Sequence, residues 1–550
     1  MNDCLEDREL LVCLPMSQLI QEQIKKRRTF AIISHPDAGK TTITEKLIYH
    51  GGVIRETGEV KGKKGTKAAT SDWMTMEQER GISITSSVIN FDYNNLRINL
   101  LDTPGHKDFS EDTYRTLVAA DTALMLIDVA KGVEDRTKKL YEVCNFRKIP
   151  IFTFINKCDR EGKSPLELID EIETTLKMKC YPVNWPLGVG ELFKGVYDRL
   201  AKKVYLYKKS SARDDEIEYE VVPISDFKDP RWKEWLHRDI YESVLEEIQL
   251  IDADNDAFDI NQFNAGKISP AFFGSAKMNF GVDLFLDYFT RWAPQPGAHK
   301  TKDGRIVDPY DDYFSGFIFK IQANMDRKHR DRIAFMRICS GEFQRGMKVQ
   351  HHRLDRELRL SHSNQFTAQD RETVDSAYAG DIIGVSDSGN FQIGDSVSTT
   401  KSLFFEDIPK FSPEMFSKMT VTDALKRQKL QKGLKELSEE GAIQLFFDPI
   451  VGMQDPLIGV VGELQFEVLK YRLEDEYNLE TKMQRMTQTV ARWPRKDDKP
   501  CKDIKGVNVV YEDMNGQPVI MVDNEWDMKW LEKENPGVIF GSPFSSGLKI

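Results

Sequence analysis

Short apolar runs alternate with amphipathic stretches in the first half of the chain, and this alternation limits the possible fold most strongly. The runs cover residues 29–34, 98–103, 122–129, 151–157 and 268–276. They are rich in Ile, Leu, Val and Phe, which is typical of parallel strands that helices cover on both faces. The pattern therefore predicts a doubly wound α/β domain over residues 29–297, in which residues 181–264 form an insertion with its own structure.

The pattern changes after a Pro- and Gly-rich linker at residues 292–304. Short alternating runs separated by Gly turns predict an antiparallel β-barrel domain over residues 313–400. A helix–strand–strand–helix pattern predicts an α+β domain over residues 412–497, and residues 498–550 are expected to pack with it. Residues 1–28 are expected to form an N-terminal leader and a helix.

The composition is that of a soluble globular protein. Hydrophobic residues make up 40% of the 550 residues and charged residues 30%. No apolar run approaches the roughly 18 to 20 residues that a membrane-spanning helix requires, so we expect a cytoplasmic protein with no membrane partner. The seven cysteines include no Cys-x-x-Cys pair, which favours reduced thiols over disulfides or a zinc site.

The net charge of −11 argues against a protein that coats nucleic acid non-specifically, because phosphate contacts require Lys and Arg. Two local basic patches lie at residues 61–67 and 326–332. Each is either a solvated loop or a contact with a large ribonucleoprotein, and the sequence leaves both interpretations open.

The loop after the first apolar run carries the first chemical signal. Residues 34–42 read Ser-His-Pro-Asp-Ala-Gly-Lys-Thr-Thr, which matches the phosphate-binding loop G-x-x-x-x-G-K-[ST] except that Ser34 replaces the first glycine. Backbone amides of such a loop surround phosphate oxygens, and the helix that follows adds its positive dipole. Lys40 is expected to reach the β- and γ-phosphates, and Thr41 to ligate Mg²⁺. Taken alone, the match leaves open an ordinary strand–turn–helix.

A second segment, Asp-Thr-Pro-Gly-His at residues 102–106, ends another apolar run. An acid at this place holds a Mg²⁺-bound water, and the Gly105 amide could sense the γ-phosphate. An isolated DTPG could also be a simple β-turn, but its order after the loop at 34–42 favours the nucleotide site. The predicted phosphate-binding residues are therefore Ser34, His35, Pro36, Asp37, Ala38, Gly39, Lys40, Thr41, Thr42 and Gly105.

A polar loop at residues 71–87 lies between these two segments. It occupies the place of a mobile loop that closes over the γ-phosphate, although a plain polar loop is the alternative. Ser83 could complete the Mg²⁺ shell together with Thr41 and Asp102. The predicted switch residues are Ile82, Ser83, Asp102, Thr103 and Pro104.

Two further segments predict which base is bound. Asp159, in Asn-Lys-Cys-Asp at residues 156–159, can accept hydrogen bonds from guanine N1–H and the 2-amino group, a donor pair that adenine lacks. Asn156 would contact the guanine edge or tether the phosphate loop, and the Lys157 stem would cover the ring. The backbone of Gly-Ser-Ala at 274–276 can meet guanine O6. The predicted guanine-binding residues are Asn156, Lys157, Asp159, Ser275 and Ala276, and the order of all these segments predicts a P-loop GTPase that binds GTP and GDP.

Together, SHPDAGKTT, RGISI, DTPGH, NKCD and GSA resemble the signature segments of the translational GTPases, the family of elongation factors Tu and G. The segments QERGISI and DTPGH, with His106, resemble that family more closely than other GTPases. RICSGEFQRGM and VGELQFEVL resemble domains two and three of elongation factor G. From residue 17 onward, long stretches are similar to the branch of the family that acts in translation termination.

The resemblance implies an enzyme that hydrolyses GTP with Mg²⁺ and is stimulated by the 70S ribosome. It implies that His106 positions the attacking water when the ribosomal sarcin-ricin loop pulls it inward, with Ile82 and Pro36 as its apolar gate. It also implies a monovalent-cation contact at Asp37. The implied function is the dissociation and recycling of class I peptide-chain release factors after termination, by a protein that we expect to be a monomer.

Two other functions are open to a chain with these motifs. One is a different ribosomal GTPase, such as a translocase or a ribosome-protection factor, but elongation factor G carries two further domains for which 550 residues leave no room. The other is a GTP-sensing protein that never hydrolyses its ligand, and the presence of His106 argues against it.

Overall fold

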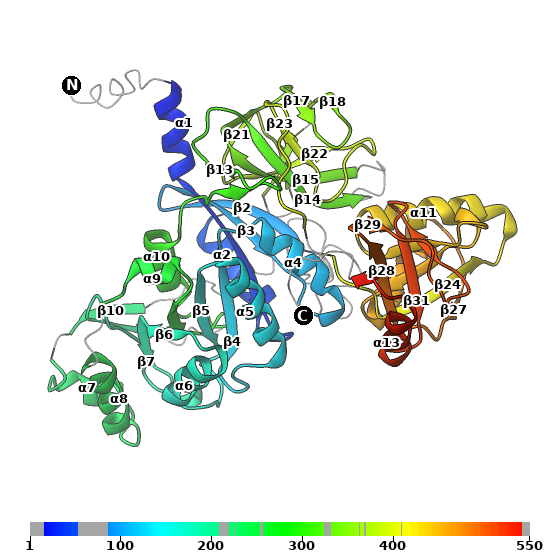
Figure 1. Ribbon diagram of the computed structural model, residues 1–550. Helices are drawn as coiled ribbons and strands as arrows, with labels where there is room; N and C mark the ends of the chain where they lie inside the picture. Colours follow the sequence, from blue (N-terminus) through cyan, green and yellow to red (C-terminus); the bar gives the residue numbers. More distant parts are fainter. Residues whose placement is uncertain are drawn as a thin grey trace.

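The computed structural model describes residues 16–52, 86–207, 219–224, 226–253, 257–323, 332–361, 363–367, 370–408 and 410–541. Figure 1 shows three bodies that follow one another along the chain. The first body, residues 27–292, holds a large sheet with its helices; the barrel, residues 315–398, lies above it in this view; and the C-terminal body, residues 415–541, lies to the side. Among these described residues, no helix combines the length and the apolar character needed to cross a bilayer.

A seven-stranded sheet of order β2-β3-β1-β4-β5-β11-β6 organises the first body. Neighbouring strands are parallel except β2, which pairs antiparallel with β3. The strands are β1 (Arg27–Ser34), β2 (Ser87–Tyr93), β3 (Leu96–Asp102), β4 (Thr122–Asp128), β5 (Ile151–Asn156), β6 (Lys179–Pro182) and β11 (Ile268–Phe273). Each of the five predicted apolar runs contains a strand of this sheet, which confirms the predicted α/β fold class.

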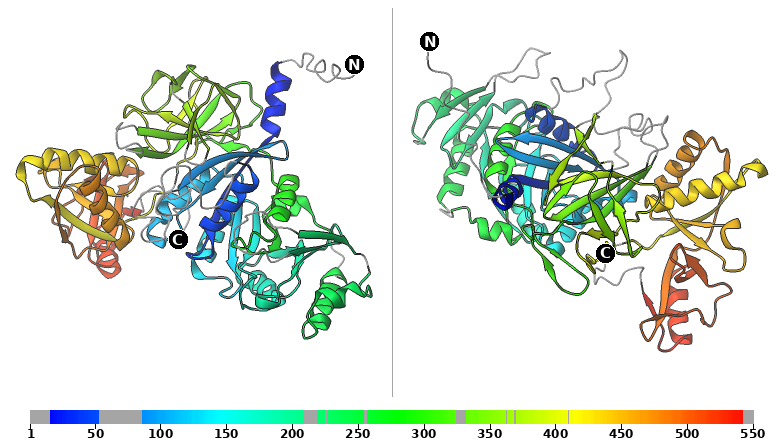
Figure 2. Two further views of the ribbon diagram at one scale, coloured as in Figure 1. Left: turned by 180° about the vertical axis from the view of Figure 1, so that it is seen from behind. Right: turned by 90° about the horizontal axis from the view of Figure 1, so that it is seen from above.

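Helices cover both faces of this sheet (Figures 1 and 2). They are α2 (Lys40–His50), α4 (Ser110–Val118), α5 (Asp135–Arg147), α6 (Pro165–Leu176) and α10 (Val282–Trp292), and α1 (Met16–Lys25) precedes β1. The strands β1, β4, β5 and β11 lie in the middle of the sheet and bury every residue, as expected for strands between two helical layers. The strand β2 is an edge strand; it is buried in its middle and partly exposed at both ends.

The insertion forms a smaller unit beside β6 and β11. Its antiparallel sheet has the order β10-β9-β8-β7. The elements are β7 (Asn184–Pro186), β8 (Gly195–Asp198), β9 (Lys203–Tyr207), β10 (Tyr219–Pro223), α7 (Arg231–Trp235), α8 (Tyr241–Ala253) and α9 (Ile260–Asn264). It therefore carries its own structure, as the length of the segment predicts.

The barrel is built from antiparallel strands. Its main sheet has the order β18-β17-β23-β14-β15-β22-β19-β20, and β16 pairs with β21. The strands are β14 (Ser315–Ala323), β15 (Arg332–Ser340), β16 (Glu342–Gln344), β17 (Lys348–His351), β18 (Arg356–Arg359), β19 (Ser363–Thr367), β20 (Asp370–Thr373), β21 (Ser376–Tyr378), β22 (Ile382–Ser386) and β23 (Ser396–Ser398). They enclose a core of their own, as the alternating pattern predicts.

The C-terminal body combines helices with one continuous path of antiparallel strands, β27-β24-β26-β25-β30-β31-β28-β29, and β32 also pairs with β28. The elements are β24 (Met415–Val421), α11 (Arg427–Glu439), β25 (Gln444–Phe447), β26 (Leu457–Val460), α12 (Glu463–Asp475), β27 (Thr481–Arg485), β28 (Val490–Lys496), β29 (Lys499–Pro500), β30 (Tyr511–Asp513), β31 (Pro518–Val522), α13 (Glu525–Glu534) and β32 (Ile539–Gly541). Because β28 pairs with β31 and β32, hydrogen bonds join residues on the two sides of position 497.

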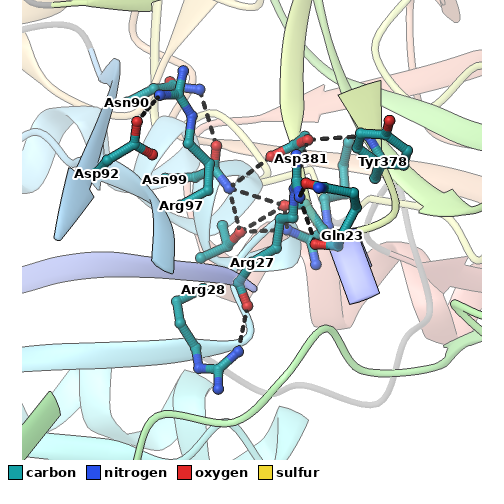
Figure 3. A network of polar contacts seen from close by, with 12 residues as sticks. Gln23, Arg27, Arg28, Asn90, Asp92, Arg97, Asn99, Tyr378 and Asp381 are labelled. Carbon is teal, nitrogen blue, oxygen red and sulfur yellow. Dashed lines mark hydrogen bonds and ion pairs between the residues drawn. The ribbon is translucent and has the colours of Figure 1, made fainter. Parts of the chain in front are cut away.

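A buried polar network joins the barrel to the first body (Figure 3). In Figure 3, Arg27 Nε faces Asp381 Oδ2 over 3.1 Å. Arg337 Nη2 lies 2.6 Å from Asp121 Oδ2. The Gly380 carbonyl accepts hydrogen bonds from Thr29 Oγ1 and from Arg337 Nη1. Buried ion pairs require close geometry, so this network holds the two bodies in one relative position.

Candidate functional site

The predicted nucleotide-binding segments meet at one edge of the seven-stranded sheet. In the parallel register, Ile32 on β1 lies beside Asp102 on β3, and Asp128 on β4 lies beside Asn156 on β5. Phe273 on β11 lies beside Ile155 on β5, so the Gly-Ser-Ala loop starts at the same level. Ligands of doubly wound sheets bind at the carboxyl ends of the strands, and this edge is therefore the candidate site.

The loop at residues 34–42 has the backbone that phosphate-binding loops require. Asp37 and Gly39 both have positive φ, at 65° and 95°. A Cβ on Gly39 would lie 2.4 Å from Asn156 Nδ2, so only glycine fits at this position. Thr41 and Thr42 lie in the first turn of α2, which contains no acidic residue to oppose an anion at the helix N-terminus.

Two side chains of this loop, those of Lys40 and Ser34, are buried. Lys40 Nζ lies 2.6 Å from Asp102 Oδ1, and both side chains are almost fully buried. The Ser34 hydroxyl is buried too, and it has no hydrogen-bond partner among the described residues. Serine therefore fits where the motif has glycine, with its hydroxyl buried.

The Asn156 side chain ties three loops together. Its Nδ2 donates to the Ala38 carbonyl over 2.8 Å, and its Oδ1 accepts from the backbone amides of Lys157 and Ala276, each over 2.8 Å. These hydrogen bonds tether the phosphate loop, which is one of the two roles considered for Asn156.

Lys157 adds a second tether to the phosphate loop. Its Nζ donates to the Asp37 carbonyl over 2.5 Å and to Asp128 Oδ2 over 2.7 Å. Burial acts to raise the pKa of Asp128, but the hydrogen bonds from Lys157 and the Ala130 amide, with attraction to Lys157, outweigh burial and lower it. The sequence interpretation missed Asp128, although it ends an apolar run at the same edge as Asn156.

The candidate base-binding residues Asp159 and Ser275 contact each other. Ser275 Oγ donates to Asp159 Oδ1 over 2.5 Å, and it accepts from the Met278 amide. This leaves Asp159 Oδ2 without a protein partner in the described part of the chain. Between Asp159 and Asn156, burial raises the pKa of the Cys158 thiol to about 12, so this thiol stays protonated.

The segment at 102–106 lies against the phosphate loop. Thr103 Oγ1 donates to the Ile32 carbonyl over 2.6 Å. A Cβ on Gly105 would lie 3.7 Å from Pro36 Cα, which shows how close the two loops run. The next residue, His106, starts a short 3₁₀ helix (Lys107–Phe109) and accepts a hydrogen bond at Nδ1 from the Asp108 amide over 3.3 Å.

Other contacts near this edge involve residues that the sequence did not single out. His35 Nε2 lies 3.2 Å from Glu134 Oε1, so the phosphate loop also contacts the segment before α5. The Pro104 carbonyl accepts from Thr113 Oγ1 on α4. Glu134 and Thr113 belong to no sequence motif, and only the folded chain brings them next to His35 and Pro104.

Several sequence predictions fall outside the described residues. Ile82 and Ser83 lie between residues 52 and 86, as does the basic patch at 61–67. Of the patch at 326–332, the structure describes Arg332, whose guanidinium pairs with Asp387 and Glu439.

Three family models match the chain in order. The model described as the elongation factor Tu GTP binding domain matches residues 25–295, elongation factor G domain 2 matches residues 313–400, and the class II release factor RF3 C-terminal domain matches residues 405–532. A crystal structure of a Thermus thermophilus protein is similar in fold, with a TM-score of 0.67 at 23% identity, covering 89% of this chain and 72% of that chain.

The sequence relatives agree with the C-terminal match. A peptide chain release factor 3 from Symbiobacterium thermophilum is 52% identical over 522 residues, which cover 95% of this chain and 98% of that relative. Those of Trichodesmium erythraeum and Streptococcus gordonii are 49% and 50% identical; they cover 94% of this chain each, and 95% and 98% of their own lengths. The chain belongs to the peptide chain release factor 3 family. This release factor 3 family member is a translational GTPase of termination, and its first body binds guanine nucleotides.

The close approach of Gly39 and Asn156 leads to a first prediction. Gly39→Ala should lower the affinity for GDP by about tenfold or more, because the new methyl group displaces the Asn156 amide and its three hydrogen bonds. Isothermal titration calorimetry with GDP measures this change.

Gly52→Ala is the matched control. Gly52 also has positive φ, at 71°, but no atom lies within 4 Å of the position that its Cβ would take. The Gly52→Ala substitution therefore introduces the same kind of backbone strain without displacing Asn156. Equal affinity losses in the two variants would show that strain, and not the contact with Asn156, controls binding.

Proposed function

We propose that the protein is a ribosome-stimulated GTPase that promotes dissociation and recycling of class I peptide-chain release factors after termination. One combination of observations carries this proposal. A sheet edge that carries the predicted nucleotide-binding segments, where Gly105, next to His106, lies close to Pro36 of the phosphate loop, occurs in the same chain as a C-terminal segment that matches the release factor 3 model. The proposed partners are the 70S ribosome with its sarcin-ricin loop and a class I release factor, and the proposed setting is the cytoplasm, with the protein acting as a monomer.

The residues present fit a bound Mg²⁺ ion. Thr41 offers a hydroxyl oxygen and Asp102 a carboxylate, and Mg²⁺ prefers such oxygen ligands. The short distance between Lys40 and Asp102 supports a location of this carboxylate beside the phosphate loop. We propose that Thr41 and Ser83 ligate the ion directly and that Asp102 acts through a water. The ion would neutralise charge on the β- and γ-phosphate oxygens.

The phosphate loop itself would hold the nucleotide. Its backbone amides, with the N-terminus of α2 and the Lys40 ammonium, favour the negative charge of the β- and γ-phosphates. The proposed base contacts are Asp159 with the guanine N1–H and 2-amino group, and the 274–276 backbone with O6. The hydrogen bond from Ser275 supports this assignment because it orients the Asp159 carboxylate.

His106 would orient the attacking water. A neutral imidazole that accepts a hydrogen bond at Nδ1 carries its proton at Nε2, so the Asp108 amide favours one tautomer. Phosphoryl transfer depends mainly on positioning and electrostatics, so an orienting group needs no unusual basicity. The His106 side chain is 32% exposed, which leaves it accessible to a ribosomal activator.

The proposed cycle is that of a nucleotide switch. The γ-phosphate orders the loops around Ser83 and Gly105, and its loss after hydrolysis releases them. The GTP-bound form would eject the class I factor, and hydrolysis would then let the protein leave the ribosome.

Ejection can be measured directly. Ribosomes that have released their peptide and retain a fluorescent class I factor are mixed with the protein and GTP, and the loss of the bound label is followed. We expect fast dissociation with GTP and slow dissociation with GDP. Dissociation that does not depend on the added protein would contradict the proposed function.

The role of His106 gives a further prediction. His106→Ala should keep GTP affinity but lower ribosome-stimulated turnover by a factor on the order of a hundred or more, because the attacking water loses its orienting group. Multiple-turnover phosphate release with and without ribosomes measures it. Turnover equal to that of the wild type would exclude this role.

Base recognition can be tested with xanthine nucleotides. Asp159→Asn should weaken GTP binding and favour xanthosine triphosphate, because the new amide group can donate to the xanthine 2-oxygen. Competition binding with the two nucleotides measures the preference. If the variant still prefers GTP, Asp159 does not select the base.

A further inference from the structure

The first turn of helix α12, in the C-terminal body, lacks a cap of its own. Its N-cap residue is Gly462, which has no side chain to accept a hydrogen bond from the helix amides. The acceptor comes instead from the first body, because Asp108 Oδ2 accepts from the Leu464 amide over 2.8 Å. Leu464 is the second residue of the helix, the position whose amide an N-cap side chain normally binds. A side chain of the first body, 356 positions away in the same chain, therefore caps α12.

The contact is too close for any residue except glycine at position 462. A Cβ on Gly462 would lie 2.1 Å from Asp108 Cγ and within 2.4 Å of both carboxylate oxygens. Just before the helix, Gln465 Oε1 accepts from the amides of Val461 and Gly462. Gln465 thus provides one half of a capping box, the side chain that accepts from the N-cap amide. The Asp108 carboxylate takes the place of the missing N-cap side chain.

Asp108 also holds His106. The Asp108 amide donates to His106 Nδ1 over 3.3 Å, and Asp108 Oδ1 lies 3.4 Å from the same nitrogen. Arg136 on α5, which donates to Ser110 Oγ, is another charged group close to this carboxylate. One buried residue therefore contacts the proposed water-orienting histidine with its backbone and the C-terminal body with its side chain.

A second contact between the same bodies has a similar form. Arg115 on α4 donates to the Gly441 carbonyl from both terminal nitrogens, over 3.3 and 3.2 Å. A Cβ on Gly441 would lie 2.1 Å from Arg115 Nη1. Both contacts depend on close approach to a glycine, so they form only when the C-terminal body is docked in this position.

We propose that Asp108 is a positioning residue that couples the placement of His106 to docking of the C-terminal body. When α12 is docked, its first turn holds the Asp108 carboxylate and with it the segment that starts at His106. When nucleotide moves that segment, the cap on α12 opens and the C-terminal body is released. Coupling of this kind is reciprocal: nucleotide binding shifts the docking equilibrium of the C-terminal body, and docking shifts the position of the His106 segment by the same free energy. The consequence for hydrolysis rests on the proposed function of His106.

Hydrogen exchange of the Leu464 amide tests the coupling. The full chain is compared in complex with GDP and with a non-hydrolysable GTP analogue, and mass spectrometry follows deuterium uptake at the start of α12. We expect uptake rates in the two complexes to differ by roughly fivefold or more, because one state loses the capping hydrogen bond. Equal rates in the two complexes would overturn the proposal.

Variants of Asp108 distinguish a purely structural cap on α12 from a contact that couples α12 to the nucleotide state. Asp108→Ala should make exchange at Leu464 fast in both complexes. Asp108→Asn keeps a capping oxygen and should keep the difference between the complexes, which also provides a conservative variant if Asp108→Ala folds poorly.

The double variant Asp108→Ala with Gly462→Asp moves the capping carboxylate to α12 itself. The alanine removes the three atoms that lie nearest to a Cβ at position 462. Exchange at Leu464 should become slow in both complexes, and the nucleotide dependence should be lost. A nucleotide dependence that persists in this variant would mean that Asp108 is only a structural cap.

Asn524→Ala is the matched control. Asn524 caps α13 from within the C-terminal body by accepting from the amides of Trp526 and Asp527. Its loss should speed exchange at the start of α13 and leave the nucleotide dependence at Leu464 unchanged.

Ribosome-stimulated GTP hydrolysis provides the second measurement. Asp108→Ala and the double variant should both change turnover by roughly tenfold or more, since docking no longer biases the His106 segment. Turnover at the wild-type level in the double variant would overturn the link to His106. If ribosomes fail to stimulate the wild-type protein, the proposed function fails, whereas the exchange result without ribosomes still decides whether Asp108 couples the two bodies.

Discussion

The hydrogen bonds of the Asn156 side chain are the interaction on which the nucleotide site depends. One amide group holds the Ala38 carbonyl of the phosphate loop and the Ala276 amide of the Gly-Ser-Ala loop. These loops follow different strands, and the Asn156 amide joins both of them to the loop that follows β5. A buried amide that loses its partners costs about 1–3 kcal/mol, so the three loops are stable only as a set. Gly39 completes the arrangement because a larger residue would occupy the place of the Asn156 nitrogen.

The contacts between the bodies use the same principle. At Gly441 and Gly462 a side chain of the first body approaches the glycine so closely that a Cβ would collide, and at Gly380 the close atoms belong to Pro296 of the linker and Arg27 of the first body. Side chains of the first body then bind backbone groups at or near these glycines: Thr29 and Arg115 donate to carbonyls, and Asp108 accepts from an amide. Backbone groups at turns and helix ends have unsatisfied hydrogen-bonding capacity, which makes them suitable for such contacts. The barrel is held by buried ion pairs in addition, whereas the C-terminal body meets the His106 segment through a helix cap and the Arg115 contacts.

Much of the fold follows from local patterns in the sequence. The runs at 29–34, 122–129 and 268–276 contain strands that are buried along their whole length, as expected for strands between two helical layers. The edge strand β2 was not predicted, since an edge strand needs less apolar character and its pairing with β3 is antiparallel. The site was harder to predict at the level of side-chain partners. Asp128 and Glu134 contact Lys157 and His35, but neither residue belongs to a spacing motif.

The sequence by itself determined the α/β fold class, the order of the nucleotide-binding segments and the family, because these depend on local periodicity and on motifs of a few residues. Only the tertiary structure decided that Asn156 is a tether, that Lys157 holds the phosphate loop, and that Asp108 caps a helix of another body. These contacts join residues up to hundreds of positions apart, as in the pair Asp108 and Leu464. Nothing in the local sequence marks such partners, since their distance depends on the packing of whole sheets and bodies and not on the neighbouring residues.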